Sequence, residues 1–414
     1  MNFLNRRTVV LGGGFGGAYV ARLLGERGAT IVSPSTSMLY TPLLAEVAAG
    51  AIEPRHVAVP LREMCPHADL VLGRAIGVDQ ATRTVEVETD RGTSAVRYER
   101  LVIALGAVPR VMPVPGLAEH ALGFKSLGDA IALRDHVLHR LEHADADPDG
   151  RERHLGFVFV GAGYAGVEAC AEVLDLVDAA LRHYPRLAGI RPRWVLVNSG
   201  ERILPEAPAR LGEYAARQLA QRGVEIRTGV KLAAVDGRSA TLSDGTRIPA
   251  ETVVWTAGVR PHPLVAQLGL PLAEDGRVEV DPFLRVRGRS DVWALGDCAH
   301  VPNEAVRRAA DPPTCQHALR QARRLARNLS GSPRPYAYRT RGQAATLGRD
   351  RGIVAAGPLR LRGAPAGLLT RAMHLTQLPL RSRRLRVLAD GALSMAFSRD
   401  MVELGMVQPK GVRA

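Results

Sequence analysis

Two glycine-rich segments, each placed directly after a short apolar run, constrain the fold of this chain more than any other feature. The first run is Thr8–Leu11, followed by GGGFGG at residues 12–17, and the second spans residues 157–160, followed by GAGYAG at residues 161–166. Both contain the spacing G-x-G-x-x-G at the point where a β-strand would lead into a helix. Such a turn lets the backbone approach a pyrophosphate and places the phosphates at the helix N-terminus. One match could be a purely structural turn, but two in this context predict two dinucleotide-binding units.

The chain is therefore expected to have an α/β fold with two Rossmann-like domains, and its 414 residues suit two or three domains. The helices after the glycine loops are predicted to end near Glu26 and Leu181. Ser126 and Asp129 have the spacing of a capping box, which predicts the start of a linker helix. The acidic stretch 143–151 marks a domain boundary. Further strands are predicted at residues 29–32, 85–87, 101–104, 194–197, 224–227, 252–256 and 292–295.

The acid that usually follows the second strand of such a unit, and binds a ribose hydroxyl, is missing from both units. Ser33 stands at this position in the first unit and Asn198 in the second. Either side chain can hydrogen-bond a hydroxyl, and neither would repel a 2′-phosphate. Arg202 could meet such a phosphate or be an ordinary solvated arginine. The sequence thus leaves the choice between NADH and NADPH open.

The positive charge of the chain is concentrated near its C-terminus. The formal net charge is +14, and residues 331–414 contain 15 basic and four acidic side chains. Leu368, Leu369, Ala372, Met373 and Leu375 recur at helical spacing, and several arginines follow at 381–386. This pattern fits a helix lying on an anionic membrane surface, with a core-packing helix as the alternative. Aromatic residues make up only 4% of the chain, so stacking on nucleic acid is not expected.

The four cysteines, Cys65, Cys170, Cys298 and Cys315, are far apart in sequence. This spacing predicts neither a local redox-active dithiol nor a zinc site. Two arginines precede the first apolar run, but that run is too short for an export signal. No run of residues reaches the roughly 18 apolar positions needed to cross a bilayer. We expect a cytoplasmic protein, held peripherally on the inner face of the cell membrane.

Three further segments are similar to signature segments of two-dinucleotide-binding flavoprotein reductases: RLVIALGAVPR at 100–110, TVVWTAGVRPHP at 252–263 and DVWALGDCA at 291–299. Over residues 5–350 the chain most resembles the type II NADH dehydrogenases. Three segments carry this resemblance: residues 38–57, the long stretch between the second glycine loop and Trp194, and PTCQHALRQARRLARNL at 313–329. The resemblance implies FAD and NADH or NADPH as cofactors and a quinone as electron acceptor. It also implies that Asp297 binds the flavin ribityl chain.

Glu172 and Gln316 are the candidate catalytic residues that the resemblance implies, because they match a glutamate and a glutamine near the flavin and the quinone. A solvated helix residue is the alternative for Glu172, and His317 is a weaker candidate for a proton shuttle. The family's second glutamine, four residues after Gln316, is replaced by Arg320. The candidate cofactor-binding residues are Gly12, Gly14, Phe15, Gly16, Gly17, Ser33, Thr41, Pro42, Ala104, Leu105, Gly106, Gly161, Gly163, Tyr164, Ala165, Gly166, Glu168, Asn198, Ala257, Gly258, Gly296, Asp297 and Gln316.

These features predict an FAD-binding domain in two parts, 1–125 and 264–330, an NAD(P)H-binding domain at 126–263, and a basic membrane-association region at 331–414. Two other functions fit the same cofactors. A sulfide:quinone oxidoreductase would need paired reactive cysteines, and a redox-responsive binding protein similar to apoptosis-inducing factor would turn over slowly with every acceptor. The oligomeric state, including a homodimer, is left open.

Overall fold

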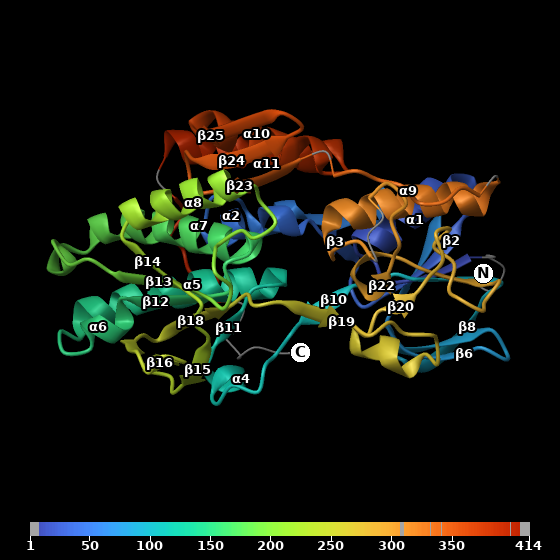
Figure 1. The fold of residues 1–414 in the computed structure, drawn as a ribbon, viewed down its shortest axis with the longest axis horizontal. Helices are drawn as coiled ribbons and strands as arrows, with labels where there is room; N and C mark the ends of the chain where they lie inside the picture. Colours follow the sequence, from blue (N-terminus) through green and yellow to red (C-terminus); the bar gives the residue numbers. More distant parts are fainter. Residues whose placement is uncertain (1–7, 307–309, 332, 341, 398, 406–414) are drawn as a thin grey trace. The chain divides into compact units, whose positions relative to one another are not determined.

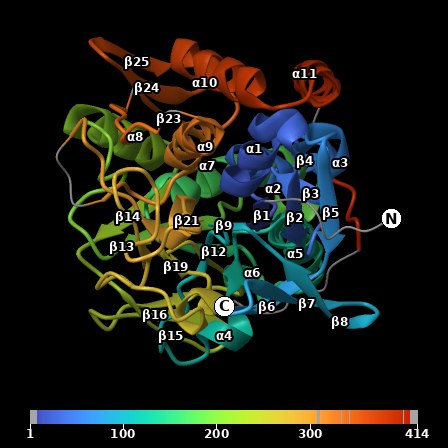
Figure 2. The ribbon, with the colours of Figure 1, turned by 90° about the vertical axis from the view of Figure 1, so that its right-hand side faces the viewer.

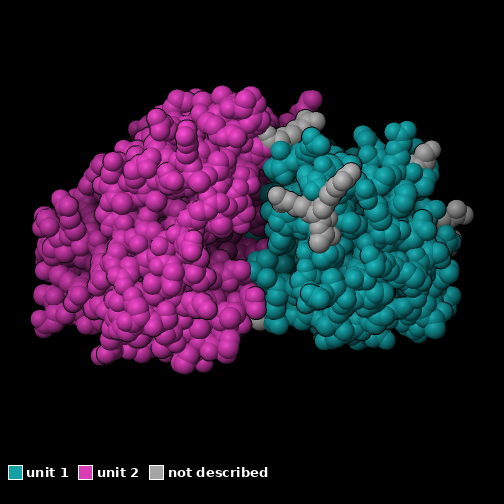
Figure 3. Space-filling model, in the orientation of Figure 1, with its two compact units in different colours: residues 1–39, 58–108, 259–340 teal, residues 40–57, 109–258, 341–414 magenta. Residues whose placement is uncertain are grey.

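The computed structural model describes residues 8–306, 310–331, 333–340, 342–397 and 399–405. Its internal contacts divide the chain into two compact units, which are coloured separately in Figure 3. Unit 1 comprises residues 1–39, 58–108 and 259–340, and unit 2 comprises residues 40–57, 109–258 and 341–414. The chain thus passes between the units several times. The assignment of FAD, NAD(P)H and membrane binding to the four segments predicted from the sequence stays a prediction.

Unit 1 is built on a five-stranded parallel sheet with the order β21-β9-β1-β2-β5. Every residue of β1 and β2 is buried, as expected for a parallel sheet that is covered on both faces. Two helices of this unit, α1 (Phe15–Leu24) and α9 (Cys315–Ser330), pack against each other, as Figures 1 and 2 both show. The strands are β1 (Thr8–Leu11), β2 (Ala29–Ser33), β5 (Ala68–Leu72), β9 (Arg100–Ile103) and β21 (Val292–Ala294).

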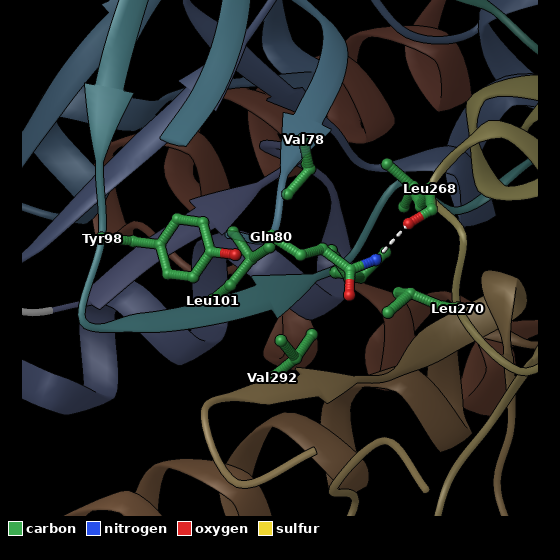
Figure 4. Close-up of a pocket in the computed structure, with 8 residues that line it drawn as sticks. Val78, Gln80, Tyr98, Leu101, Leu268, Leu270 and Val292 are labelled. Atoms are coloured by element: carbon green, nitrogen blue, oxygen red, sulfur yellow. Dashed lines mark hydrogen bonds between the residues drawn. The ribbon is translucent and has the colours of Figure 1, made fainter. Parts of the chain in front are cut away.

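The rest of unit 1 consists of smaller sheets and a short helix. An antiparallel meander, β6-β7-β8, contains the predicted strand at 85–87. Between this meander and the main sheet, an apolar crevice is lined by residues that include Tyr98 and Leu101, and the Gln80 amide donates there to the Leu268 carbonyl (Figure 4). The elements are β3 (Ser37–Leu39), β4 (Ala58–Pro60), α3 (Leu61–Met64), β6 (Arg74–Asp79), β7 (Thr84–Thr89), β8 (Gly92–Arg97), β10 (Ala107–Pro109), β19 (Val259–Pro261), β20 (Val278–Glu279) and β22 (Ala299–His300).

Unit 2 contains a second five-stranded parallel sheet, with the order β11-β18-β12-β13-β14. The linker helix α5 (Leu127–Ala146) begins at Ser126, whose hydroxyl accepts from the backbone N–H of Asp129 in a complete capping box. This start of α5 confirms the prediction from the sequence. The strands are β11 (Leu122–Gly123), β12 (Gly156–Val160), β13 (Arg193–Asn198), β14 (Val224–Thr228) and β18 (Thr252–Trp255), and the larger helices are α7 (Tyr164–Ala180) and α8 (Ala209–Gln221).

A short antiparallel sheet, β15-β16-β17, shares an apolar core with this parallel sheet. Helix α2 (Leu44–Ala48) is buried along its whole length and packs against α5 and α7. The remaining elements of this part are α4 (Leu117–His120), α6 (Arg151–His154), β15 (Leu232–Val235), β16 (Ser239–Leu242) and β17 (Arg247–Pro249).

The C-terminal part of unit 2 forms a three-stranded antiparallel sheet followed by two helices. The strands β23 (Gln343–Thr346), β24 (Gly352–Ala356) and β25 (Leu359–Gly363) were not predicted, whereas a helix over 368–375 was. That helix is α10 (Ala364–Gln377), which packs on the sheet, and α11 (Arg381–Ala396) follows it. Within the described ranges, no helix is both long enough and apolar enough to span a bilayer. The two parallel sheets confirm the predicted fold class.

Candidate functional site

The first glycine loop in unit 1 closes on itself and on the end of strand β9. Gly12 has a φ of +107°, and a Cβ atom at this position would lie 2.3 Å from the carbonyl oxygen of Ala104. A Cβ atom on Gly17 would lie 1.9 Å from the carbonyl oxygen of Gly12. A side chain at either position would collide with backbone, so the tight turn requires glycine at both.

The second glycine loop, in unit 2, repeats this geometry. Gly161 has a φ of +104°, and a Cβ atom there would lie 2.8 Å from the backbone nitrogen of Ala257. A Cβ atom on Gly166 would lie 1.9 Å from the carbonyl oxygen of Gly161. The hydroxyl of Thr256 donates to the carbonyl oxygens of Val160 and Gly161, each at 2.9 Å. The loop therefore packs against the end of β18, as the first loop packs against the end of β9.

The middle glycine of each G-x-G-x-x-G motif, Gly14 or Gly163, has open space at its Cβ position, unlike the first and last glycines. Gly14 precedes α1 and Gly163 precedes α7, and no heavy atom beyond the immediate chain neighbours lies within 4 Å of a Cβ atom built on either. The N-cap residue of each helix is a glycine, which has no side chain to cap the first turn. A helix N-terminus beside an open approach attracts an anion. Each loop therefore fits the pyrophosphate of a dinucleotide.

The other predicted residues of unit 1 follow the carboxyl ends of neighbouring strands, as expected for a binding crevice in such a sheet. The segment 104–106 follows β9, and Gly296 and Asp297 follow β21, which pairs with β9. The backbone N–H of Gly296 donates to Oε1 of Gln321 on α9 at 2.8 Å. This bond fixes the Asp297 turn against α9, and Gln316 lies on the first turn of the same helix.

Ser33 and Asn198, which replace the usual acid, both form hydrogen bonds with the backbone of nearby loops. Ser33 is 3% exposed, and its hydroxyl donates to the carbonyl of Ser35 at 2.9 Å. Oδ1 of Asn198 accepts from the N–H of Ala162 at 3.3 Å, within the second glycine loop. Arg202 donates to the carbonyls of Pro205 and Ala207. All three side chains thus have backbone partners, and a ribose or phosphate contact from them stays a prediction.

In unit 2, helix α7 carries three acidic side chains on one face: Glu168, Glu172 and Asp175. Glu172 is fully buried, and its Oε2 accepts from Nη2 of Arg399 at 2.7 Å. This burial excludes the alternative of a solvated helix glutamate. Asp175 accepts from both Arg222 and Arg399.

Glu46 on α2 extends this group of acids and is 4% exposed. Burial, reinforced by the neighbouring charge of Glu172, raises the pKa of Glu46 from 4.5 to about 7. Burial and the charge of Glu46 raise the pKa of Glu168 well above its ordinary value, against a hydrogen bond from the N–H of Thr346 at 3.0 Å. Glu46 was not among the predicted site residues, although it lies in the segment 38–57 on which the family resemblance rests. Arg399 was not predicted either, because no local pattern identifies it.

Around His317 in unit 1, the structure shows a second buried polar network. Nδ1 of His317 lies 2.6 Å from Oδ2 of Asp311 and 3.3 Å from the hydroxyl of Tyr336. The guanidinium of Arg320 lies over the ring of Tyr338, 5.1 Å from its centroid. The Tyr338 ring stands edge-on to His317, with the ring centroids 5.6 Å apart. Arg320, the residue that departs from the family pattern, therefore packs on an aromatic ring of this network.

The structure divides the predicted site residues into two groups, one in each unit. Those in unit 1 are Gly12, Gly14, Phe15, Gly16, Gly17, Ser33, Ala104, Leu105, Gly106, Gly296, Asp297 and Gln316. Those in unit 2 are Thr41, Pro42, Gly161, Gly163, Tyr164, Ala165, Gly166, Glu168, Glu172, Asn198, Ala257 and Gly258.

Comparison with solved structures finds the same fold in NDH2 of Plasmodium falciparum in complex with NADH. The TM-score is 0.89 at 16% sequence identity, covering 96% of this chain and 99% of that one. An NAD-dependent persulfide reductase from A. fulgidus matches with a TM-score of 0.69 at 22% identity, over 85% of this chain and 64% of that one.

Sequence comparison identifies the family. Residues 6–322 match the family described as pyridine nucleotide-disulphide oxidoreductase. The chain is 32% identical over 400 residues to the type II NADH:quinone oxidoreductase Ndh of Mycobacterium tuberculosis, which covers 90% of this chain and 84% of the relative. It is 30% identical over 400 residues to the demethylphylloquinone reductase NdbB of Synechocystis, with 92% and 94% covered. The chain therefore belongs to the pyridine nucleotide-disulphide oxidoreductase family and, within it, to the type II NADH:quinone oxidoreductases.

Proposed function

We propose that this protein is an FAD-dependent oxidoreductase that takes hydride from NADH or NADPH and passes the electrons to a quinone. The observation that carries the proposal is the pair of glycine loops, one in each unit, in a chain that belongs to a family of quinone reductases. Two dinucleotide sites allow one nucleotide to remain bound as the prosthetic group while the other exchanges as substrate.

FAD is assigned to unit 1, where the first glycine loop would bind the pyrophosphate. The open space beside Gly14 and the glycine N-cap of α1 fit that group. Asp297, held against α9 by the bond between Gly296 and Gln321, is assigned to the ribityl chain. The flavin supplies the redox chemistry when bound, and the surrounding residues orient it and exclude water.

NADH or NADPH is assigned to unit 2, where the second glycine loop would bind its pyrophosphate. The hydroxyl of Tyr164, the first residue of α7, is buried without a hydrogen-bond partner in the part of the chain that the structure describes. An unpaired buried hydroxyl is costly unless a ligand or water satisfies it. Tyr164 is therefore suited to hydrogen-bond the bound nucleotide.

We propose that Gln316 and Glu172 act in the second half-reaction, in which the quinone is reduced. Gln316 lies on the first turn of α9, after the N-cap Thr314. Its amide can hydrogen-bond a quinone oxygen as donor. Glu172 is buried, and only one of its carboxylate oxygens is hydrogen-bonded among the described residues.

The experiment that tests donor and acceptor together is anaerobic reduction followed by addition of a soluble quinone. NADH and NADPH are mixed in parallel with the purified flavoprotein, and the visible flavin absorbance is followed. We expect bleaching by at least one nucleotide and rapid recovery of absorbance when the quinone is added. Absence of recovery with quinones, together with recovery with other acceptors, would remove the quinone from the proposal.

The sulfide:quinone alternative, which needs a pair of reactive cysteines, conflicts with the surroundings of three of the four thiols. Such chemistry needs a thiolate. Burial instead raises the pKa of Cys65 to about 11, that of Cys170 to about 12 and that of Cys298 to about 11. Slow turnover with every acceptor would favour the other alternative, a redox-responsive binding protein.

Peripheral attachment to the inner face of the cell membrane is assigned to helices α10 and α11. Leu368 is 73% exposed, Leu385 is 66% exposed and Leu393 is 57% exposed. Among the described residues of α11, only Val387 is buried, which disfavours a core-packing role for this helix. Arginines on the same helix suit the phosphates of anionic lipids; they are Arg381, Arg383, Arg384 and Arg386.

A further inference from the structure

Three histidines form a continuous series of ring contacts in unit 2. His139 and His143 lie one turn apart on α5, so their side chains share one face of the helix, and both are exposed. Their ring centroids are 4.6 Å apart. His154 lies on the short helix α6, which packs against α5 (Figure 1), and its ring stands edge-on to His143 with the centroids 5.4 Å apart. The exposed pair therefore rests on a third histidine ring, which is buried.

The two exposed rings approach each other through the same ring nitrogen. Nε2 of His139 lies 3.0 Å from Nε2 of His143. Bonds of about 2.0–2.1 Å from a metal ion to histidine place two neighbouring ligand nitrogens about 2.9–3.4 Å apart, depending on whether the angle at the metal is square or tetrahedral. The separation of the two Nε2 atoms falls in this range. The pair is therefore arranged to hold one metal ion without a change in the backbone of α5.

The buried ring of His154 is held in place by two carboxylates. Its Nδ1 lies 3.1 Å from Oε2 of Glu251, and its Nε2 lies 3.3 Å from Oδ2 of Asp147. Both ring nitrogens of His154 are thus engaged, and the side chain is only 4% exposed. The ring supports His143 from the side and leaves metal binding to the exposed pair.

The charges around the pair allow a cation to bind. Arg140, which follows His139 on α5, is the nearest arginine in the sequence, and it forms an ion pair with Glu251. Two acids lie beside the histidines, Glu142 on α5 and Glu403 on the segment after α11. In the part of the chain that the structure describes, neither of them forms an ion pair with an arginine or lysine. Their negative charge therefore stays available to stabilise a nearby cation.

Glu403 is placed beside His139 by the backbone that follows it. The N–H groups of Leu404 and Gly405 donate to the carboxylate of Asp135 on α5, at 3.0 and 2.9 Å. Oε1 of Glu403 lies 3.9 Å from Nδ1 of His139, the ring nitrogen that does not face His143. A histidine that binds a metal ion usually donates its other ring N–H to a carboxylate or carbonyl, which fixes the ring and its tautomer. Glu403 is in the position of such a carboxylate.

We propose that Nε2 of His139 and Nε2 of His143 bind one divalent transition-metal ion of the class that imidazole prefers, Zn²⁺, Ni²⁺ or Cu²⁺. Glu403 is the positioning residue that holds His139, and the bound ion strengthens the attachment of residues 402–405 to α5. Among the described residues, no group of three His, Cys, Asp or Glu side chains is placed to hold a metal ion, so water completes the coordination. The site needs neither nucleotide nor quinone.

The protons of the pair balance when the ion binds. Without metal, one Nε2–H donates to the other Nε2 in a hydrogen bond between two neutral rings. On binding, this proton leaves Nε2 and another is taken up from water at Nδ1 of the same ring, so that both Nε2 lone pairs face the metal. At His139 the resulting Nδ1–H can donate to Glu403. Both rings stay neutral, and the metal adds its full charge beside the two acids.

Zinc binding to the full-length flavoprotein, prepared without a histidine tag, is the first test. Calorimetry with Zn²⁺ is expected to show one bound equivalent in the wild type that is lost in His139→Gln and in His143→Gln. His120→Gln changes an exposed histidine on α4 and is the matched control, which should bind like the wild type. A wild type that binds no more Zn²⁺ than the double variant His139→Gln/His143→Gln would overturn the site.

Electron paramagnetic resonance with Cu²⁺ counts the ligands, since the oxidised flavin gives no signal. The wild type is expected to show couplings from two imidazole nitrogens and each single histidine variant from one. Glu403→Gln should keep both couplings but lower the affinity for Zn²⁺ by about ten-fold, the effect of losing a partner of a metal-bound histidine. Glu213→Gln, an exposed glutamate on α8, is its control, and the two variants should unfold at the same temperature without metal. Equal affinity of both variants would overturn the positioning role of Glu403, and a single nitrogen coupling in the wild type would overturn the pair.

Hydrogen exchange at the segment 402–405 tests whether the ion fixes this part of the chain. The N–H groups of Leu404 and Gly405, which donate to Asp135, are expected to exchange more slowly when Zn²⁺ is added to the wild type. His143→Gln, which loses the ion, should show no slowing. Unchanged exchange in the wild type with Zn²⁺ bound would contradict the strengthened attachment to α5.

Discussion

Nη2 of Arg399 lies 2.7 Å from Oε2 of Glu172, and this ion pair joins the C-terminal segment of the chain to the helix that follows the second glycine loop. Both side chains are nearly inaccessible to solvent, with 4% of Arg399 and none of Glu172 exposed. A buried ion pair of this kind adds little stability compared with apolar packing, but removal of one partner leaves a costly buried charge. The pair therefore ties the segment after α11 to helix α7.

Replacement of Arg399 by Met is expected to destabilise the protein by about 3–5 kcal/mol, the usual cost of breaking one side of a buried ion pair. The free energy of unfolding is measured by urea denaturation, with Arg210→Met, an exposed arginine at the start of α8, as control. The double variant Glu172→Gln/Arg399→Met should recover part of the loss, because it removes both charges. Equal stability of Arg399→Met and the control would contradict a buried pair.

The two glycine loops predict separable defects. Gly12→Ala places a Cβ atom 2.3 Å from the Ala104 carbonyl, and Gly161→Ala places one 2.8 Å from the Ala257 nitrogen, both at positive φ. Gly12→Ala is expected to lower the flavin content of the purified protein. Gly161→Ala is expected to retain flavin and to raise the KM for NADH by about ten-fold or more, since strained backbone costs about 1–3 kcal/mol. Gly391→Ala, where a Cβ atom meets nothing within 4 Å and φ is not positive, is the control.

The sequence predicted those features that depend on neighbouring residues. The glycine loops, the buried parallel strands and the Ser126 capping box each have a local signature, and the structure contains them all. The strand β25 was missed because its segment LRLRG is mostly exposed and alternates arginine with leucine. The strand β24 was also missed, although its segment GIVAA is a short and largely buried apolar run. A cluster that depends on tertiary packing leaves no such local pattern. Glu46 and Arg399 are more than 350 residues apart, and only folding brings both to α7.

The thiols are expected to be dispensable for electron transfer. Cys170 is fully buried on α7, and burial raises its pKa to about 12, so almost none of it is thiolate at neutral pH. The double variant Cys170→Ala/Cys315→Ala should therefore keep the wild-type rate of quinone reduction by NADH, measured in steady state. Loss of quinone reduction with normal flavin content would instead support thiol chemistry of the sulfide:quinone type.

Membrane attachment should depend on exposed leucines of α11. Leu385 is 66% exposed and Leu388 is 54% exposed, and insertion of each into a lipid interface would bury apolar area worth about 1.5–3 kcal/mol when complete. Leu385→Ser/Leu388→Ser is therefore expected to weaken binding to anionic vesicles by about ten-fold or more in a sedimentation assay. Its turnover with a water-soluble quinone should stay normal, because the helix has no part in the nucleotide loops.

The matched control for this surface is Leu272→Ser, a 38% exposed leucine in unit 1. It should bind vesicles like the wild type. The dependence of vesicle binding on salt is a second test. The arginines beside Leu385 and Leu388 attract anionic headgroups, and this attraction is screened beyond about 10 Å at 0.1 M ionic strength. Wild-type binding should therefore weaken as salt rises and should be poor on neutral vesicles. Equal binding of the Leu385→Ser/Leu388→Ser variant and the control would place the membrane contact elsewhere on the chain.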